Sequence, residues 1–519
     1  MSRSMLDLGT SFLASVARDP DALALVDGDI RLRYAEWLGK ISSLVRAFDR
    51  MGLRPGEHLL TALQNTWQAA TVHWACQLAG LIITPVNWRV NADELDFCIE
   101  NSESRALIYQ DVSENAVAAS KRASGLIVMR AGSKPAAGEF SLDALCNERA
   151  DDVPPRADAE AWSIMLYTSG TTSRPKGVPR RHRAERAAGL AHVAQNLYRR
   201  GECTLGVMPL YHTMGVRSLI AMSLIGGTFV CMRRFDPQAA LSLIASERVT
   251  NLYLVPTLYH DLVHCDAFAQ ADISSVAKLG FAGAPMTDGL LQKLAQTFRP
   301  DLFVNHYGSS EIYTFTIEQD AAAKPGSAGK AGINQQVKVV KLNAVSVDKV
   351  ADVGEEGEVV ALLAGDESFE GYWRRPDADA RALRDGWYFT GDTGCVDQDG
   401  DLFVTGRVDD MIITGGENVS PVEIESCLSL HPAVLEVAVV GLPDERWGKV
   451  VTAFVKRSHP VSEQDLDKHC RDSGLAAFKR PRRFIFVDAI PKSPVGKLLR
   501  RLLVAGEYQA EGIPPSNAA

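Results

Sequence analysis

Short apolar runs alternate along most of this chain with segments whose apolar residues have helical spacing. Apolar runs of strand length between helices predict parallel sheets that are covered by helices on both faces. The strands expected from these runs are 58–63, 81–85, 106–109, 205–208, 228–232, 251–255, 278–281 and 302–306. Near the N-terminus, 22–26 and 30–34 predict a small hairpin, which a helix over 37–49 follows.

The pattern changes after Ala331, where short alternating strands and turns take over. The strands expected there are 337–342, 357–363, 387–389 and 402–404, and they predict a smaller β-rich subdomain. A polar segment, 406–410, comes next. The roughly one hundred residues after it are enough for a small separate domain. The fold class expected is therefore α/β, with a β-rich part and a C-terminal domain added.

Composition narrows the function classes. With 519 residues the chain is too long for one core, and its net charge of −9 gives no reason to expect nucleic-acid binding. Nine cysteines without a C-x-x-C pair indicate neither a zinc site nor a disulfide framework, so a reducing cytoplasm fits best. Residues 1–13 lack the long apolar core of a signal peptide. The most apolar window, 219–231, flanked by Arg217 and Arg233, is too short to span a bilayer and predicts a buried helix followed by a strand.

The segment YTSGTTSRPKG, residues 167–177, is the strongest candidate for chemistry. Its glycines let backbone N–H groups approach an anion closely, its hydroxyls can donate to phosphate oxygens, and Lys176 adds a point charge. It is not the Walker pattern, because no Ser or Thr follows the lysine. The segment alone is also compatible with a solvated turn.

Further polar clusters follow the expected strands. Gly-Ala-Pro at 283–285 can hold an adenine ring, and Glu311 can approach triphosphate oxygens only with Mg²⁺ between them. Asp392 can accept hydrogen bonds from ribose hydroxyls, and Arg407 can bind phosphate or ribose oxygen. Each of these clusters taken singly is also typical of an ordinary turn.

Taken in order, the clusters resemble one family over nearly the whole chain. The segments YTSGTTSRPKG, PLYH, AGAP, HYGSSE, FTGD, GRVDDMIITGGENVSP and PKSPVGK resemble the adenylate-forming superfamily of acyl-CoA synthetases, adenylation domains and luciferases. Within it, the combination of 209–212, 409–412 and 478–481 is most similar to aryl-carboxylate CoA ligases, of the 4-chlorobenzoate CoA ligase type.

The resemblance implies an enzyme that uses ATP, Mg²⁺ and coenzyme A in two steps. The carboxylate first attacks the α-phosphorus of ATP to give an acyl-adenylate and pyrophosphate, and the coenzyme A thiolate then displaces AMP. It also implies a large domain, 1–408, of two parallel-rich α/β sheet subdomains plus a β-rich subdomain. A small mobile α+β domain, 409–519, would rotate between the steps about Asp409. Lys497 would neutralise charge between the carboxylate and the α-phosphate in the first step only.

The same resemblance implies roles for individual residues. The β- and γ-phosphates would be held by Thr168, Ser169, Gly170, Thr171, Thr172 and Lys176. The nucleoside would contact Gly283, Ala284, Pro285, Tyr307, Gly308, Ser309, Ser310, Asp392 and Arg407. Catalysis would fall to Lys497, His212, Thr172 and Glu311, with Glu311 as the Mg²⁺ ligand. Coenzyme A would contact Gly415, Gly416, Glu417, Trp447, Phe478 and Arg480.

The acid pocket implied by position is lined by His212, Thr213, Met214, Tyr253, Ala282, His306, Gly308, Tyr313 and Thr314. Tyr253, His306 and Tyr313 are bulky, which favours a compact aromatic or heteroaromatic acid such as a benzoate, halobenzoate, hydroxybenzoate or furoate. A medium-chain or alicyclic acid stays open. So do a stand-alone adenylation enzyme that loads a carrier protein, a non-catalytic nucleotide-binding scaffold, and a homodimer.

Two residues depart from the usual family pattern. Ser173 stands where most relatives have glycine, and Ser310 replaces the more frequent threonine before Glu311. Neither change touches the glutamate, the ribose aspartate or the lysine. The segment around Lys497 also resembles the context in which bacterial relatives are acetylated on the catalytic lysine, so an acetyltransferase and a deacetylase are further expected partners. Acetylation would remove the charge that adenylation needs.

Overall fold

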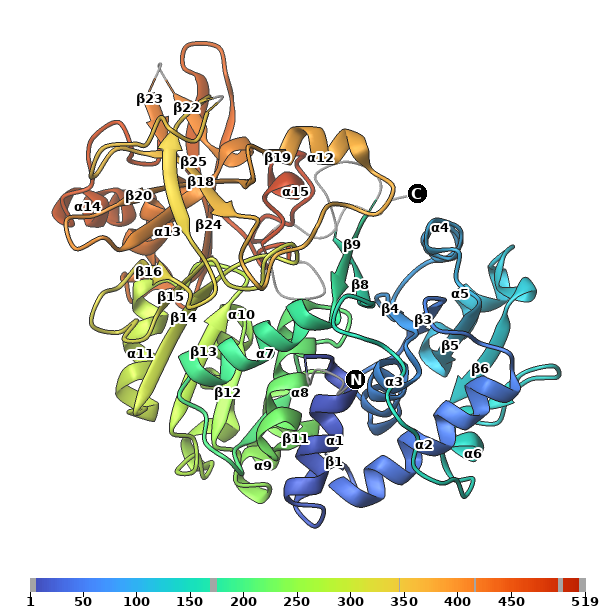
Figure 1. The fold of residues 1–519 in the computed structure, drawn as a ribbon. Coiled ribbons are helices and arrows are strands. Elements are labelled where there is room, and N and C mark those ends of the chain that lie inside the picture. Colours follow the sequence, from blue (N-terminus) through green and yellow to red (C-terminus); the bar gives the residue numbers. More distant parts are fainter. Residues whose placement is uncertain (1–5, 169–174, 345, 415–416, 493–497, 513–519) are drawn as a thin grey trace.

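The computed structural model describes residues 6–168, 175–344, 346–414, 417–492 and 498–512. Within these residues the strands form three sheets, two in the N-terminal region and one in the C-terminal region (Figure 1). The two N-terminal sheets are rich in parallel pairs, as the alternation of apolar runs and helices predicts. No helix among the described residues has the length and apolarity that crossing a membrane requires.

The seven-stranded sheet is built from residues 58–181. Its strand order is β7 (Phe140–Ser141), β6 (Ile127–Ala131), β5 (Ala106–Gln110), β3 (His58–Ala62), β4 (Ile82–Pro85), β8 (Trp162–Thr168) and β9 (Lys176–Arg181). The last two strands form an antiparallel hairpin, and the other pairs are parallel. The helices of this part are α2 (Tyr34–Arg50), α3 (Trp67–Ala79), α4 (Ala92–Ser102), α5 (Glu114–Ala119) and α6 (Leu142–Cys146).

The fourteen-stranded sheet joins the parallel strands to the β-rich part in one hydrogen-bonded series. Its parallel section runs β14 (Leu302–Tyr307), β13 (Lys278–Ala282), β12 (Asn251–Leu254), β10 (Cys203–Gly206), β11 (Thr228–Cys231) and β1 (Leu23–Asp27), with β2 (Ile30–Arg33) at the edge. Beyond β14 follow β15 (Thr316–Glu318), β16 (Ser327–Ala331), β21 (Leu402–Arg407), β20 (Trp387–Val396), β18 (Gly357–Leu362) and β17 (Val337–Lys341), while β19 (Leu383–Arg384) pairs with β20. The β-rich subdomain predicted after Ala331 therefore continues the parallel sheet.

Helices fill the space between the two N-terminal sheets. One core cluster contains side chains from both sheets and from α1 (Leu8–Arg18), α3 and α8 (Thr213–Ile225). Every residue of α3 is buried, including the polar residues Gln68, His73 and Gln77, so this helix is enclosed on all sides. The helix α8 ends at Gly226, whose φ of 67° lies in the left-handed region. The apolar window 219–231 is thus the buried helix and strand that the sequence predicts.

The remaining helices cover the outer faces or join strands. They are α7 (His182–Gln195), α9 (Pro237–Ser246), α10 (Pro256–Val263), α11 (Asp288–Phe298) and α12 (Pro376–Ala382). A second core cluster lies between the parallel strands and α9, α10 and α11. Parallel strands covered on both faces leave only the strand ends for polar chemistry.

The C-terminal region has its own sheet and core. The sheet runs β23 (Glu417–Val419), β22 (Ile412–Thr414), β25 (Gly448–Arg457) and β24 (Val434–Asp444), and β26 (Arg483–Phe486) pairs with β25. The helices α13 (Pro421–Ser429) and α14 (Glu463–Asp472) pack on its core, while α15 (Arg500–Val504) contacts β24. The chain leaves the N-terminal sheet after Arg407 and enters this one at Ile412.

The two regions touch through helices α11 and α13. The contact is close at Gly289, where an added Cβ atom would lie 2.7 Å from the carbonyl oxygen of Ser429. A second contact joins the Ser420 hydroxyl to the carbonyl oxygen of Thr405. The first of these contacts depends on a residue without a side chain.

Candidate active site

The site begins at a switch point of the fourteen-stranded sheet. After β10 the chain passes to β11 on one side and then to β12 on the other, so the connections leave β10 and β12 in opposite directions. In open α/β sheets, ligands bind outside the carboxyl ends of the strands at such a point. Residues 209–214 follow β10, and Tyr253 lies near the end of β12. The fold therefore brings these segments together at a place suited to a ligand.

The predicted acid residues lie at neighbouring strand ends. Ala282 ends β13 and pairs in register with His306 of β14, while Tyr253 pairs with Gly280. Met214, Tyr253 and Ala282 share one small apolar cluster with Met208 and Val255. Three sequence segments that are far apart thus meet in one buried group.

The start of α8 is fixed by close backbone packing. His212 is the N-cap residue, and Thr213 is the first helical residue. An added Cβ atom at Gly215 would lie 2.3 Å from the carbonyl oxygens of Met208 and Pro209. Only glycine allows the helix to begin so near the preceding loop. This packing places His212, Thr213 and Met214 next to the strand ends, with His212 and Thr213 half-buried and Met214 buried.

The residues predicted for the ribose are in direct contact. The Tyr307 hydroxyl, at the end of β14, donates to Asp392 Oδ2 over 2.6 Å. Arg407 Nη1 lies 3.0 Å from Asp392 Oδ1, because the two residues are register partners in β20 and β21. Gly391 has a φ of 72°, and a Cβ atom there would lie 3.2 Å from Arg407 Nη2. Glycine at 391 therefore gives Arg407 room to reach the aspartate.

The loop predicted for the adenine follows β13. Gly283 has a φ of 83°, so the chain turns sharply at the strand end. Ala284 and Pro285 come next, while Gly308, Ser309 and Ser310 follow the neighbouring β14. The Ser309 N–H donates to the carbonyl oxygen of Ile312 over 2.9 Å, which closes that second loop. Both loops leave the same edge of the sheet, beside Tyr307.

Glu311 and Lys176 are linked by a residue that the sequence motifs do not include. Tyr372 donates its hydroxyl to Glu311 Oε1 over 2.7 Å, and Lys176 Nζ lies 4.1 Å from the centre of the Tyr372 ring. Burial lowers the pKa of the Lys176 ammonium, and the neighbouring Glu311 carboxylate opposes that shift. Tyr372 therefore contacts the Glu311 carboxylate through its hydroxyl and the Lys176 ammonium through its ring.

The surroundings of Glu311 fit a divalent cation. Its side chain is 6% exposed, and no basic side chain among the described residues forms an ion pair with it. A buried carboxylate without a cationic partner is costly, and an oxygen-seeking ion such as Mg²⁺ would offset that cost. Arg180 Nη1 donates to the Glu311 carbonyl oxygen over 3.0 Å, and this arginine also forms a fully buried ion pair with Glu185. The hydrogen bond from Arg180 thus fixes the position of the Glu311 backbone.

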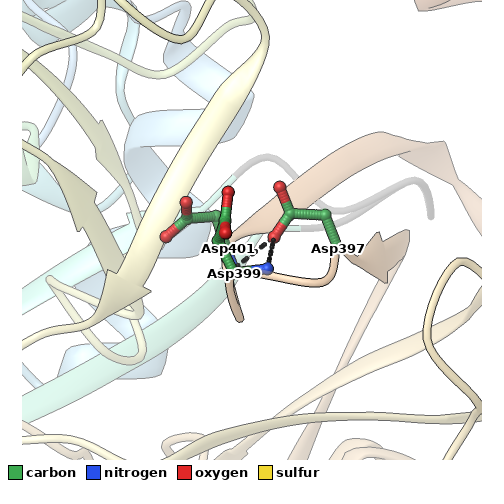
Figure 2. A group of neighbouring side chains, drawn as sticks. All are labelled: Asp397, Asp399 and Asp401. Atoms are coloured by element: carbon green, nitrogen blue, oxygen red, sulfur yellow. Dashed lines mark hydrogen bonds between the residues drawn. The ribbon is translucent and has the colours of Figure 1, made fainter.

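A second acidic group, Asp397, Asp399 and Asp401, lies in the turn between β20 and β21 (Figure 2). The N–H groups of Asp399 and Asp401 donate to Asp397 Oδ1 over 3.0 and 2.9 Å. Lys324 Nζ lies 2.6 Å from Asp397 and 2.9 Å from Asp399, and it also contacts Asp401. Because the ammonium supplies the positive charge here, this group is a lysine-neutralised hairpin turn.

Part of the phosphate loop lies outside the described residues. Thr168 ends β8 and pairs with Lys176, the first residue of β9, so the hairpin brings the two ends of the loop together. Ser169, Gly170, Thr171, Thr172 and Ser173 fall outside the described residues, as do Gly415, Gly416 and Lys497. The predictions for these residues stay predictions.

The hinge candidate Asp409 lies in a 3₁₀ turn, 408–410, between β21 and β22. Glu417 begins β23, which lies with β22 at the upper edge of Figure 1, well separated from the β8–β9 hairpin. In this domain orientation the residues predicted for adenosine are together, whereas Glu417 is not beside them.

The residues predicted for coenzyme A lie on the C-terminal surface. The half-buried Trp447 has the guanidinium groups of Arg482 and Arg446 4.3 and 4.9 Å from its ring centre. Phe478 is 41% exposed, and Arg480 is half-buried with no partner for its Nε among the described residues. The Trp447 ring predicted to contact coenzyme A is therefore flanked by two cations, Arg446 and Arg482, neither of which belongs to the predicted set.

Comparison with known proteins places this geometry in context. A family model described as "AMP-binding enzyme" matches residues 12–373, and "AMP-binding enzyme C-terminal domain" matches residues 423–497. A 4-chlorobenzoate–CoA ligase of an Arthrobacter species is 35% identical over 494 residues, 94% of this chain and 93% of that protein.

Two further proteins extend the comparison. A long-chain-fatty-acid–CoA ligase of Mycobacterium tuberculosis is 31% identical over 482 residues, 92% of this chain and 93% of that protein. The crystal structure of an anthranilate CoA ligase in complex with anthranoyl-AMP superposes with a TM-score of 0.90 at 25% identity, covering 96% of this chain and 97% of that one. The similar proteins thus include ligases of both aromatic and long aliphatic acids.

Proposed function

This chain belongs to the AMP-binding enzyme family and is an AMP-forming acyl-CoA ligase, and we propose that its acid is a small aromatic or heteroaromatic carboxylic acid. The observation that carries the proposal is the set of rings at the strand ends. Tyr253, His306 and Tyr313 are all buried, and the ring centres of Tyr253 and His306 lie 5.9 Å apart in an edge-on arrangement. Such rings leave little length for an alkyl chain and offer faces and edges to another ring.

For the adenylation step we propose the following division of labour. Asp392, oriented by Tyr307 and Arg407, accepts the ribose hydroxyls, while Lys176 and the loop at 168–172 hold the departing pyrophosphate. Glu311 holds Mg²⁺, which would neutralise phosphate charge when bound. Lys497 stabilises the charge that develops between the carboxylate and the α-phosphate. The support is that Tyr307, Asp392 and Arg407 are in direct contact with one another.

For the thioester step we propose that the C-terminal region, 409–519, rotates about Asp409. In the orientation of Figure 1 the described strands beside Gly415 and Gly416, β22 and β23, are well separated from the β8–β9 hairpin that flanks the predicted phosphate loop. Rotation would exchange Lys497 for this loop, and Trp447, Phe478 and Arg480 would hold the coenzyme A nucleotide. Hinges of this kind are a few loop residues that absorb large dihedral changes.

The acid is tested by a substrate panel in a pyrophosphate-release assay. Benzoate, 4-chlorobenzoate, hydroxybenzoates and 2-furoate are compared with hexanoate and cyclohexanecarboxylate, with Lys497→Ala as the inactive control. We expect kcat/KM of the best aromatic acid to exceed that of hexanoate by about tenfold or more, since pocket shape discriminates on this scale. A higher value for hexanoate or cyclohexanecarboxylate than for every aromatic acid would reject the proposal and favour an aliphatic ligase.

The thiol acceptor is tested separately. Enzyme, ATP and the best acid are mixed with coenzyme A alone, and the acyl-CoA is measured by mass spectrometry. The cations around Trp447 support coenzyme A, whose nucleotide carries several negative charges. Adenylate formation without any acyl-CoA would favour a carrier-protein acceptor instead.

A further inference from the structure

A buried cation lies among the acid residues, and no sequence motif includes it. Arg217 is on α8, four residues after Thr213 and three after Met214, so it shares their face of the helix one turn further on. Its side chain is 2% exposed. A charged side chain is almost never buried to this degree unless it has partners or a function.

The partners of Arg217 are members of the acid set. Nη1 donates to the Tyr313 carbonyl oxygen over 3.0 Å and to Thr314 Oγ1 over 3.1 Å, and it lies 3.3 Å from His306 Nε2. Nη2 donates to the Tyr253 hydroxyl. The guanidinium therefore contacts four residues of the predicted acid pocket: Tyr253, His306, Tyr313 and Thr314.

All of these partners are uncharged. Burial, together with the Arg217 charge, holds the pKa of His306 well below its usual range, so the imidazole is neutral. The nearby His192, whose ring stacks on His306 at 5.7 Å, is neutral for the same two reasons. Arg217 thus polarises neutral groups and forms no ion pair among the described residues.

One donor of this cation is unused. The Arg217 Nε atom is buried and has no hydrogen-bond partner among the described residues. An unpaired buried donor on a charged group costs free energy, so such atoms point to a ligand or a function. Nη1 and Nη2 each have at least one hydrogen-bond partner, which leaves Nε as the one nitrogen of this guanidinium without a partner among the described residues.

The charge balance limits what this donor can bind. Glu367 is 1% exposed, and burial raises its pKa, while the neighbouring charges of Arg217 and Arg180 oppose that shift. Glu185 pairs directly with Arg180. Two buried acidic side chains therefore already interact with the two guanidinium groups, and a second carboxylate on the substrate would add a further negative charge to this buried group. A neutral acceptor fits better.

We propose that Arg217 Nε donates a hydrogen bond to a neutral oxygen or nitrogen acceptor on the ring of the acid. Arg217 then selects acids with a hydroxyl, an alkoxyl or a ring heteroatom over acids with a methyl or an unsubstituted ring. The inference rests on the proposed function, because it names a substrate class within the aromatic acids. Sites built to hydrogen-bond a substrate group discriminate strongly against analogues that lack it.

The test compares pairs of acids that match in shape. The adenylation kcat/KM is measured for each hydroxybenzoate against the methylbenzoate of the same substitution pattern, and for 2-furoate against thiophene-2-carboxylate. In the unaltered enzyme we expect at least one pair to favour the stronger acceptor by about 30-fold. In Arg217→Met that ratio should fall to about one, while Arg217→Lys should keep an intermediate ratio.

Two further variants guard against structural effects. Arg217→Met/Glu367→Gln removes the carboxylate charge that the single change would leave unmatched. Arg186→Met is the matched control, because Arg186 contacts Ser11, outside the acid group, and should leave every ratio unchanged. Thermal unfolding midpoints identify any variant that has lost its fold.

The outcomes are distinct. Ratios near one in the unaltered enzyme overturn the inference without any variant, as do ratios that survive Arg217→Met or its double variant. A loss of activity that is equal for both acids of a pair would show that Arg217 only supports the fold of the pocket. Failure of every aromatic acid with turnover of an aliphatic one would instead reject the proposed function, and the inference with it.

Discussion

The proposed acid region at the strand ends and the proposed coenzyme A surface on the C-terminal domain are built by opposite means. Tyr253, His306 and Tyr313 are buried, the Tyr253 hydroxyl lies 3.4 Å from His306 Nδ1, and Arg217 donates to the Tyr313 carbonyl oxygen. Trp447 and Phe478 lie on a surface, and cations rather than packed neighbours flank the indole. In the proposed function, the geometry of the first region is set by packing within the N-terminal sheet, whereas the position of the second depends on the rotation of the C-terminal region. The proposal therefore combines a preorganised site with one that a domain movement brings into place.

The largest expected effect comes from removing the ammonium of Lys497, which the C-terminal region is proposed to bring to the active site. Lys497→Ala should lower the rate of adenylation by about 10²–10³-fold, the scale for losing one group that stabilises developing charge. Thioester formation from a supplied acyl-adenylate should change far less, because the lysine serves the first step only. Single-turnover rates of the two half-reactions make the measurement. Stoichiometric acetylation of Lys497 should reproduce the result, and intact adenylation after acetylation would contradict it.

A smaller effect is expected at the hinge. Asp409→Pro fixes one backbone dihedral in the 3₁₀ turn and should slow thioester formation by about tenfold or more, with adenylation nearly unchanged. The same single-turnover pair reads this out. Equal losses in both half-reactions would mean that the two regions do not move independently, and the contrast between them would fail.

The geometry around Glu311, in the N-terminal part of the proposed active site, is tested at Tyr372. Tyr372→Phe removes the hydroxyl that donates to Glu311 Oε1 and leaves the ring beside Lys176. One hydrogen bond to a charged group is worth about 1.5–3 kcal/mol, so kcat/KM for MgATP should fall by roughly 10- to 100-fold at limiting Mg²⁺ and recover in part at high Mg²⁺. Tyr388→Phe, which alters only the weaker neighbouring contact, is the control. No dependence on Mg²⁺ would argue against Glu311 as its ligand.

The smallest effect is expected on the coenzyme A surface. Trp447→Leu should raise KM for coenzyme A about threefold to tenfold and leave adenylation unchanged, because an exposed stacking contact contributes about 1 kcal/mol. Arg446→Gln should have a similar but weaker effect, since it removes one of the flanking cations. An adenylation defect in either variant would place this surface at the first step and remove the distinction between the regions.

The sequence predicts the parallel strands well and the β-rich strands less well. The buried runs at 251–255 and 302–306 correspond to β12 and β14 within a residue at each end. By contrast, β20 extends from 387 to 396, although the apolar pattern predicts only 387–389. Gly391 and Asp392, which belong to the proposed ribose site, interrupt the alternation, so a functional requirement would explain why the hydrophobic pattern misses the rest of the strand.

Two side chains of the site are absent from the sequence-based set for different reasons. Tyr372 has no local signal, since its role depends on Glu311, 61 residues earlier. Arg217 does carry one, because it stands beside the most apolar window of the chain, where an arginine must be buried with its helix. A charged residue beside so apolar a window is itself a signal for a buried functional group, and this signal points to Arg217.

The strength of the contact between helices α11 and α13 depends on the absence of a side chain at Gly289. Because a Cβ atom there would press against Ser429, replacement by alanine would raise the energy of this orientation without touching any ligand. The populations of the two orientations are set by their energy difference, so one methyl group at this distance would shift the balance towards the other state. If the proposed rotation takes place, a substitution at Gly289 would change the rate or extent of the domain movement from a position outside the proposed active site.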